Sequence, residues 1–181
     1  MDFIDGQPLD KCWNDLPPDS QTRIAMQIAD MINEMQSINI SRPGPFGCEQ
    51  FPWRGRFFTD YSAGPFKGVS EMEDWFNHKL EICQHYGHAS KDTPRFQFDT
   101  FVLTHQDISP RNIILAPDGQ PWLIDWAHAG AYPPVFESAG LSVQHHFKDF
   151  SERVLTLITR FPKEEAKLDS ITYGLTTAAL A

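Results

Sequence analysis

The chain has 181 residues, of which 41% are hydrophobic, and its formal net charge is −9. A chain of this length can bury one well-formed core. The acidic balance argues against a nucleic-acid partner, because phosphate backbones are bound by clustered lysine and arginine side chains. We also expect no membrane segment, since no run approaches the ~18 apolar residues that a span needs, and the acidic N-terminus is unlike a signal peptide.

The cysteines Cys12, Cys48 and Cys83 are widely spaced along the chain. An odd number of cysteines without a C-x-x-C pair favours a reduced protein over a disulfide framework. We therefore expect a cytoplasmic location.

The first predicted helix follows Pro17 and Pro18. Its apolar residues recur at spacings of three and four and mark one buried face, which we interpret as core: Ile24, Ile28, Met31, Ile32, Met35 and Ile38. The next segment, 41–68, is rich in proline, glycine and aromatic residues and predicts a long ordered loop. Long loops in compact domains are often functional. This loop could cover part of a substrate pocket, although aromatic packing alone explains it equally well.

A second helix is predicted from Ser70, where Ser-Glu-Met-Glu has the form of a capping box. Gly87 is the expected terminator. The predicted inner face consists of Met72, Trp75, Phe76, Leu80 and Cys83. Three histidines fall on the polar face or beyond the helix end, so we interpret them as surface residues rather than a metal cluster: His78, His85 and His88.

Residues 96–103 predict a strand, and the pattern becomes helical again after the middle of the chain. One helix is predicted from about Leu141 to residue 160, and a last helix over 163–180. The inward-facing residues of the first of these are Val143, Phe147, Phe150, Val154, Leu157 and Ile158. His145 and His146 are adjacent, so on a helix they point in different directions and make a poor metal chelate.

A hairpin is predicted around Pro117-Asp-Gly-Gln120, because Asp-Gly between two apolar strand-like runs is a strong hairpin signal. If Asp118 and Gly119 are the central turn residues, the register sets Asn112 directly opposite Asp125. Opposed residues of an antiparallel pair have Cα atoms roughly 4.5–5.5 Å apart. Two oxygen ligands at that separation can share one Mg²⁺.

Asp107 lies on the loop that enters this hairpin, and the order H-x-D-x-x-x-x-N, hairpin, Asp follows the logic of a kinase catalytic loop. In such a site Asp107 would accept the proton of an acceptor hydroxyl, Asn112 and Asp125 would hold magnesium, and His105 would brace the loop. Two other interpretations stay open. These residues could populate an ordinary polar turn, or His105, Asp107, Asp125 and His128 could form a metallohydrolase site.

The chain resembles a known family at these residues. His105-Gln-Asp-Ile-Ser-Pro-Arg-Asn112, Ile124-Asp-Trp126, Ala129-Gly130 and Pro133-Pro134 are similar to motifs of the aminoglycoside phosphotransferase/choline kinase-like superfamily, and within it to fungal-type proteins. The chain has Gln106 where the family commonly has glycine, and Ala127 where it often has glutamate. The second departure bears on the substrate side of the site.

The resemblance extends to both sides of the catalytic segment. Met1-Asp-Phe-Ile-Asp-Gly6, with Leu9-Asp10 and Trp13, is similar to the family's hinge, which implies that Phe3 and Ile4 contact the nucleotide. Trp53 with Arg54, and Gly64-Pro-Phe66, fit the region between hinge and catalytic loop.

The resemblance implies an α+β fold, the C-terminal lobe of a protein-kinase-like structure. This lobe would be mostly helical and would carry the site on a small antiparallel β-hairpin. Residues 1–181 would form a single domain with a hinge-like segment at 1–13. The sequence contains no G-x-G-x-x-G or G-x-x-x-x-G-K-[ST] phosphate clamp. We therefore expect a truncated form without the N-terminal lobe, with a short isoform or a degenerate remnant as alternatives. The missing lobe or another partner would cover the exposed hinge face.

Two functions follow from the resemblance. The first is an ATP- and Mg²⁺-dependent phosphotransferase that acts on a hydroxyl group of a small molecule, and the complete polar set favours it. The second is a non-catalytic, pseudokinase-like binding module, which the missing lobe favours. An acidic surface could attract a cationic substrate, although ordinary solubility also explains it.

Overall fold

The computed structural model describes residues 3–47, 52–59 and 61–180. Its helices are α1 (Pro18–Gln36), α2 (Val69–His85), α3 (Val135–Ser142), α4 (Lys148–Leu155), α5 (Pro162–Ser170) and α6 (Thr172–Leu175). Short 3-10 turns are η1 (Leu9–Lys11), η2 (Trp13–Asp15), η3 (Pro110–Asn112) and η4 (Trp126–His128). Met1, Asp2 and Cys48, named above, lie outside the described residues.

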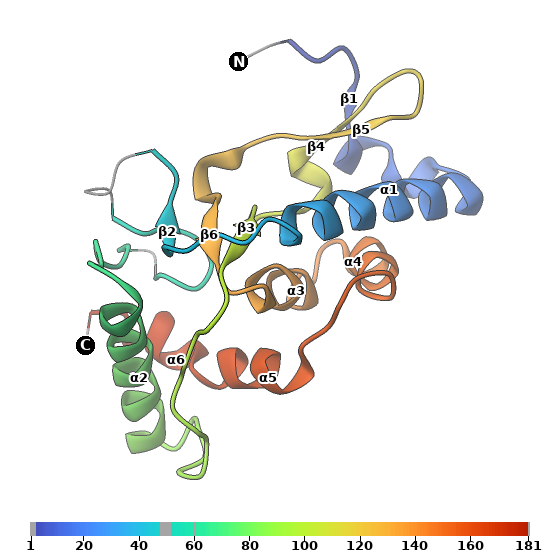
Figure 1. Ribbon diagram of the computed structural model, residues 1–181. Helices are drawn as coiled ribbons and strands as arrows, with labels where there is room; N and C mark the ends of the chain where they lie inside the picture. The colour runs from blue at the N-terminus through green and yellow to red at the C-terminus, as the bar shows by residue number, and fades with distance from the viewer. Residues whose placement is uncertain (1–2, 48–51, 60, 181) are drawn as a thin grey trace.

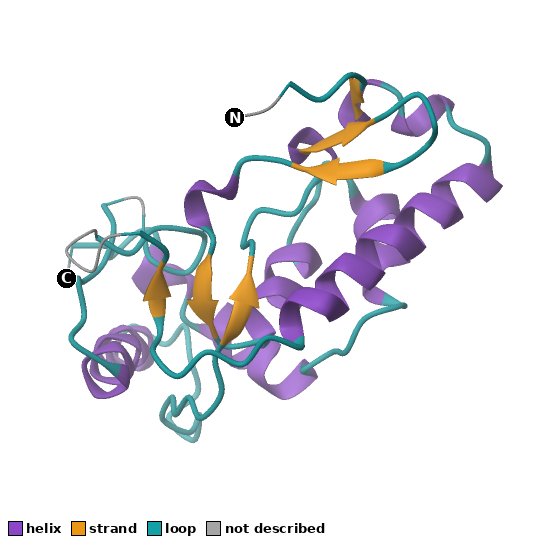
Figure 2. Ribbon diagram, turned by 45° about the horizontal axis from the view of Figure 1, so that its top comes forward, coloured by secondary structure: helices purple, strands orange, loops and turns teal. Residues whose placement is uncertain are grey.

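Of two small antiparallel sheets, one lies alongside α1 and the other lies at the C-terminal end of this helix (Figures 1 and 2). One has the order β1 (Gln7–Pro8), β4 (Ile113–Leu115), β5 (Pro121–Leu123). The other has the order β2 (Gly44–Pro45), β6 (Gly130–Tyr132), β3 (Val102–Thr104). Helices and small sheets together confirm the predicted α+β class.

Helix α1 begins as predicted, with Pro18 at its first position, where a missing N–H costs no hydrogen bond. Its buried face contains Ile24, Ile28, Ile32 and Met35 from the predicted stripe. Ile38 was wrong: the helix ends at Gln36, and the Ile38 side chain is 47% exposed beyond it.

Helix α2 buries the predicted residues Met72, Phe76, Leu80 and Cys83, and it ends before Gly87 as expected. The predicted capping box was wrong. No side chain caps the first residue in the usual way; instead the Lys67 backbone N–H donates to the Glu71 carboxylate at 2.9 Å.

The segment 96–101 runs extended beside α2 but forms no strand, so the predicted strand shortens to Val102–Thr104. Side chains of α2 take the place of a neighbouring strand here. The Phe96 N–H donates to Asn77 Oδ1 at 2.6 Å, and the Phe98 N–H donates to Glu73 Oε1 at 2.7 Å. Asn77 Nδ2 also donates to the Phe96 carbonyl at 3.1 Å. Side chains of α2 therefore make three hydrogen bonds to the backbone at Phe96 and Phe98 that a neighbouring strand would otherwise make.

The C-terminal helices differ from the prediction. The expected helix from Leu141 to residue 160 is two helices, α3 and α4, with a break at residues 143–147. Helix α3 begins six residues earlier than expected and is buried from Val135 to Leu141. An element buried on all sides shows no amphipathic period, so periodicity could not reveal its start. The last predicted helix is likewise divided at Ile171 into α5 and α6.

The β4–β5 hairpin forms, but in a register one residue away from the predicted one. Ile113 pairs with Leu123 and Leu115 pairs with Pro121, so Asn112 does not oppose Asp125. The turn is a three-residue loop in which the Gly119 N–H donates to the Ala116 carbonyl at 2.9 Å and Gly119 has φ of 84°. A type I turn followed by a left-handed glycine is a common alternative to the two-residue turn.

The buried side chains form two clusters. An aromatic cluster around Phe58, Phe76, Tyr132 and Phe136 packs between α2, α3 and β6. A mainly aliphatic cluster fills the space between α1, α4 and the hairpin, and it contains Ile108 and Ile113. Ile108 within the loop 105–112 and Ile113 directly after it thus anchor this loop in the aliphatic cluster.

Within the described residues, none of the helices has the length and apolar character needed to cross a membrane.

Candidate active site

His105 is buried in the loop between β3 and η3, and both of its ring nitrogens take part in hydrogen bonds to the backbone. Nε2 lies 3.0 Å from the Ile124 carbonyl, and the Asp107 N–H donates to Nδ1 at 3.3 Å. This pattern requires a neutral ring that donates from Nε2. Burial lowers the pKa of His105, which favours the same neutral form. The His105 ring therefore links the backbone at Asp107 to the backbone at Ile124.

Glu137 of α3 anchors the same loop from inside the molecule. Its carboxylate accepts the His105 N–H at 2.6 Å and the Gln106 N–H at 3.2 Å. Gln106 has φ of 65°, a conformation in which both amides turn toward Glu137. Burial raises the pKa of Glu137 to about 7, while the two N–H groups oppose this rise. The sequence prediction missed Glu137, although an acidic residue inside the apolar run Val135–Leu141 was a usable signal.

Asp107 and Asn112 are joined directly. Asn112 Nδ2 donates to the Asp107 carboxylate at 2.7 Å and to the Asp107 carbonyl at 2.9 Å. This bond uses one carboxylate oxygen of Asp107, and the other oxygen lies outside it. Because the Asn112 amide nitrogen faces Asp107, the Asn112 amide oxygen points away from Asp107 and is free to coordinate a cation.

Asp125 follows the hairpin in a left-handed conformation, with φ of 60° and ψ of 66°. The residue before it is held on both sides: the Ile124 N–H donates to the Asn112 carbonyl at 3.0 Å, and the Ile124 carbonyl accepts from His105. The position of Asp125 is therefore set by the contacts of Ile124 with Asn112 and His105, and not by direct opposition of Asp125 to Asn112. Its side chain is exposed.

The donor atoms of Asn112 and Asp125 suit magnesium. An amide oxygen and a carboxylate are hard oxygen ligands, which Mg²⁺ prefers. The contacts of His105 argue against the metallohydrolase interpretation. His105 has no free ring nitrogen for a metal, and across the described ranges no three His, Cys, Asp or Glu side chains are grouped closely enough to hold one.

Phe3 and Ile4, the predicted nucleotide contacts, lie on the segment before β1. That strand pairs with β4, with Gln7 opposite Leu115. Phe3 is 90% exposed, whereas Ile4 is partly buried. The described residues thus leave the Phe3 side chain unenclosed, and its contact with a nucleotide stays a prediction.

A cavity of about 450 Å³ opens beside Asp107, and we call it the acceptor-side pocket. It lies between the loop after β2, the catalytic loop and the end of α6. Its lining residues are Arg54, Gly55, Arg56, Thr59, Ser62, Gln106, Asp107, His128, Leu175 and Thr176. The sequence indicated Arg54 only through the family resemblance and gave no sign of Arg56 or Gly55, because they belong to an irregular loop.

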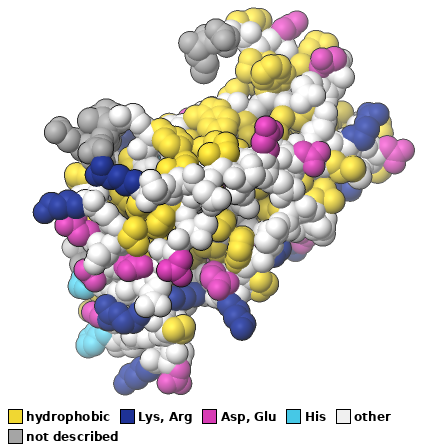
Figure 3. Space-filling model, viewed as in Figure 1, with side chains coloured by type: hydrophobic (Ala, Val, Ile, Leu, Met, Phe, Trp, Pro, Cys, Tyr) yellow, Lys and Arg dark blue, Asp and Glu magenta, His cyan; other side chains and the backbone are white. Residues whose placement is uncertain are grey.

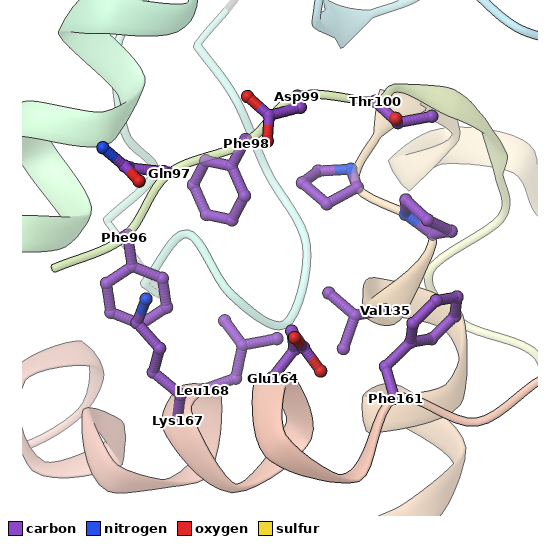
Figure 4. A pocket seen from close by; sticks show the side chains of 12 residues that line it. Phe96, Gln97, Phe98, Asp99, Thr100, Val135, Phe161, Glu164, Lys167 and Leu168 are labelled. Atoms are coloured by element: carbon purple, nitrogen blue, oxygen red, sulfur yellow. The ribbon is translucent and has the colours of Figure 1, made fainter. Parts of the chain in front are cut away.

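Two other cavities contain none of the predicted site residues. An apolar groove of about 540 Å³ runs between α1 and β5 and includes Trp122 and Trp126, in the region where Figure 3 shows hydrophobic side chains above α1. A cavity of about 210 Å³ lies between residues 96–100, the start of α3 and α5. Phe96, Phe98, Val135 and Phe161 surround it (Figure 4).

Solved structures of the aminoglycoside phosphotransferase APH(2″)-IIa resemble this chain. Its complex with gentamicin matches with a TM-score of 0.55 at 16% sequence identity, over 93% of this chain and 57% of that chain. Its ternary complex with streptomycin and ATP matches with a TM-score of 0.55 at 16% identity, over 94% of this chain and 58% of that one. The chain thus spans a little over half the length of these structures.

The fold is therefore kinase-like, of the aminoglycoside phosphotransferase type, and corresponds to a C-terminal lobe. The model of the phosphotransferase enzyme family, APH, matches residues 1–161, and the chain belongs to this family. No curated protein matches the chain.

Proposed function

We propose that this chain carries the catalytic loop and the metal ligands of a phosphotransferase that moves the γ-phosphoryl group of ATP to a hydroxyl group of a small molecule. The observation that carries the proposal is the junction at Asn112. Its side chain bonds Asp107, while its carbonyl accepts the N–H of Ile124, the residue before Asp125. Three separate chemical roles therefore meet at one point of the fold.

In the proposed reaction Asp107 orients the acceptor hydroxyl and takes its proton as the oxygen forms a bond to phosphorus, while the bond to ADP breaks. Asn112 and Asp125 would hold magnesium. The metal, when bound, supplies neutralisation of charge on the phosphates. Asn112 and His105 keep the loop in place, so that little rearrangement is required during the transfer.

Two isosteric substitutions test the division of roles. Asp107→Asn should lower acceptor phosphorylation by roughly 10²–10⁴-fold, the range expected for loss of a general base, and should leave Mg-ATP affinity nearly unchanged. Asp125→Asn should weaken Mg-ATP binding itself. Both can be measured by calorimetric titration with Mg-ATP and by acceptor-dependent release of ADP. Asp118→Asn makes the same charge change on the exposed hairpin turn and serves as the control.

A second candidate is a pseudokinase-like module that binds nucleotide without transferring phosphate. The same titrations separate the two. Mg-ATP binding that depends on Asp125, without transfer to any hydroxyl compound, would support the binding module. Equal loss of Mg-ATP affinity in both variants would contradict the assignment of Asp107 as a base.

A further inference from the structure

The acceptor-side pocket contains two arginines and one carboxylate among its described lining residues: Arg54 and Arg56 against Asp107. This local balance is opposite in sign to the net charge of −9 of the whole chain. Among the described lining residues, positive charge therefore exceeds negative charge beside the proposed base, although the molecule is acidic.

The two arginines are held by an anchored loop. Trp53 before them and Phe57 after them are buried, with 2% and 6% of their side chains exposed. Gly55 between them has φ of 124°, and a Cβ atom at this position would lie 2.7 Å from Gln106 Oε1. The glycine thus lets the Arg-Gly-Arg turn lie directly against the catalytic loop, with one arginine on each side of the contact.

Neither Arg54 nor Arg56 forms an ion pair with another residue that the structure describes. Among the residues that the structure describes, no carboxylate lies within ion-pair distance of Arg54 or Arg56, whereas Arg95, Arg153 and Arg160 each pair with an acidic side chain. Arg56 makes one long hydrogen bond, from Nη2 to the Val143 carbonyl at 3.5 Å. Partial burial lowers the pKa of Arg56, and the nearby charge of Asp107 opposes that change. The guanidinium still carries its charge near neutral pH.

We propose that the acceptor is a small hydroxyl compound that carries a carboxylate or phosphate group, with the anion held by Arg54 and Arg56 and the hydroxyl placed at Asp107. This inference rests on the proposed phosphotransferase function and names its class of substrate. Guanidinium groups match the geometry of both anions and bind them through paired, charge-assisted hydrogen bonds. A polycationic acceptor would place its ammonium groups against the same two arginines.

Direct binding tests the substrate class without requiring turnover. The full chain is titrated calorimetrically, at one fixed ionic strength, with glycerol 3-phosphate, glycerate, glycerol and kanamycin. We expect each anion to bind at least about tenfold more tightly than glycerol, since a hydrogen bond to a charged group supplies that much affinity. Arg54→Gln and Arg56→Gln should each remove about tenfold of the anion affinity and leave glycerol binding unchanged.

Arg23→Gln is the matched control, because Arg23 is exposed near the start of α1 and makes the same change of charge. Urea midpoints of all three variants show whether they remain folded. The inference is overturned if kanamycin binds more tightly than both anions, if the anions bind no better than glycerol, or if Arg23→Gln weakens them equally. It is also overturned if Arg56→Gln reduces Mg-ATP affinity instead, because the arginine would then hold nucleotide.

These outcomes are distinct from failure of the proposed function. A protein that binds the anions through Arg54 and Arg56 but never transfers phosphate would retain the anion site and lose the catalytic role. A protein that phosphorylates kanamycin in preference to either anion would retain the catalytic role and lose the anion site.

Discussion

Glu137 holds the catalytic loop through the N–H groups of His105 and Gln106, and it does so from a fully enclosed position. Two amide donors do not fully replace the water that a charged carboxylate loses on burial, so burial still disfavours the ionised form of Glu137. The residue that best fixes the geometry of the loop is therefore also a pH-sensitive one.

The stability of the protein should reflect this residue near neutral pH. Burial raises the pKa of Glu137 from 4.5 to about 7, so between these values the folded state binds more protons than the unfolded state. Stability from this group is complete below pH 4.5 and is lost as the pH rises through about 7. The loss corresponds to about 3 kcal/mol.

Comparison with Glu137→Gln isolates this effect. Because the pKa of His105 is lowered, its contribution to the free energy of unfolding rises with pH, opposite to that of Glu137. The carboxyl of Glu165, whose pKa Arg160 lowers to about 2, changes the free energy of unfolding only in stronger acid. Both contributions cancel in the difference between wild type and variant. Urea unfolding from about pH 5 to about pH 8 should show wild type losing about 3 kcal/mol relative to Glu137→Gln. Parallel curves would mean that Glu137 does not titrate in this range.

At the scale of elements, side chains of α2 make the hydrogen bonds to the extended segment 96–101 that a neighbouring strand would otherwise make. Asn77 of α2 satisfies both the N–H and the carbonyl of Phe96, and Glu73 satisfies the N–H of Phe98. The segment that leads into β3 is therefore held by side chains of a helix at two alternate residues.

Asn77→Leu removes both partners of Phe96 while keeping a side chain of similar size. Two buried polar groups lose their hydrogen bonds, so we expect a loss of roughly 2–4 kcal/mol in the free energy of unfolding. Amide hydrogen exchange should accelerate at Phe96 and stay slow at Phe98. Glu73→Gln, which still offers an oxygen to the Phe98 N–H, is the control. Unchanged exchange at Phe96 would show that Asn77 is not its essential partner.

The sequence predicted α1, α2 and the hairpin because each has a clear period or a turn signal. It did not predict the strandless segment 96–101, since bonds between side chains and a distant backbone leave no local pattern. It also missed α3, which is buried on all sides. The residues Asp107, Asn112 and Asp125 could be named from their order along the chain. Glu137 and the pair Arg54 and Arg56 depend on tertiary contacts that no short motif records.

At the scale of the molecule, the C-terminal segment closes back onto α2. Lys79 is only 2% exposed, and its ammonium group donates to the carbonyls of Ala179 at 2.9 Å and Ala178 at 3.3 Å. Leu175 and Thr176, just before these residues, form one wall of the acceptor-side pocket. A buried lysine thus connects the last turn of the chain to the edge of the proposed site.

Removal of residues 177–181 takes two carbonyl partners from a buried ammonium group. We expect the free energy of unfolding to fall by roughly 2–4 kcal/mol, measured by urea unfolding. Lys79→Met in the shortened chain should recover part of this loss, because methionine fills the same space without a charge. A shortened chain that is as stable as the parent would show that these carbonyls do not hold Lys79.

The turn at Pro117–Gly119 is exposed at the far end of the hairpin, while the other end is fixed by the bonds of Ile124 to Asn112 and His105. Changes of length in the turn therefore need not propagate to Asp125. Exposed loop tips between fixed ends are the positions where foreign sequence is best accepted. This turn is thus a suitable point at which to insert a fluorescent label or an affinity peptide, because a reporter there does not touch the residues of the proposed site.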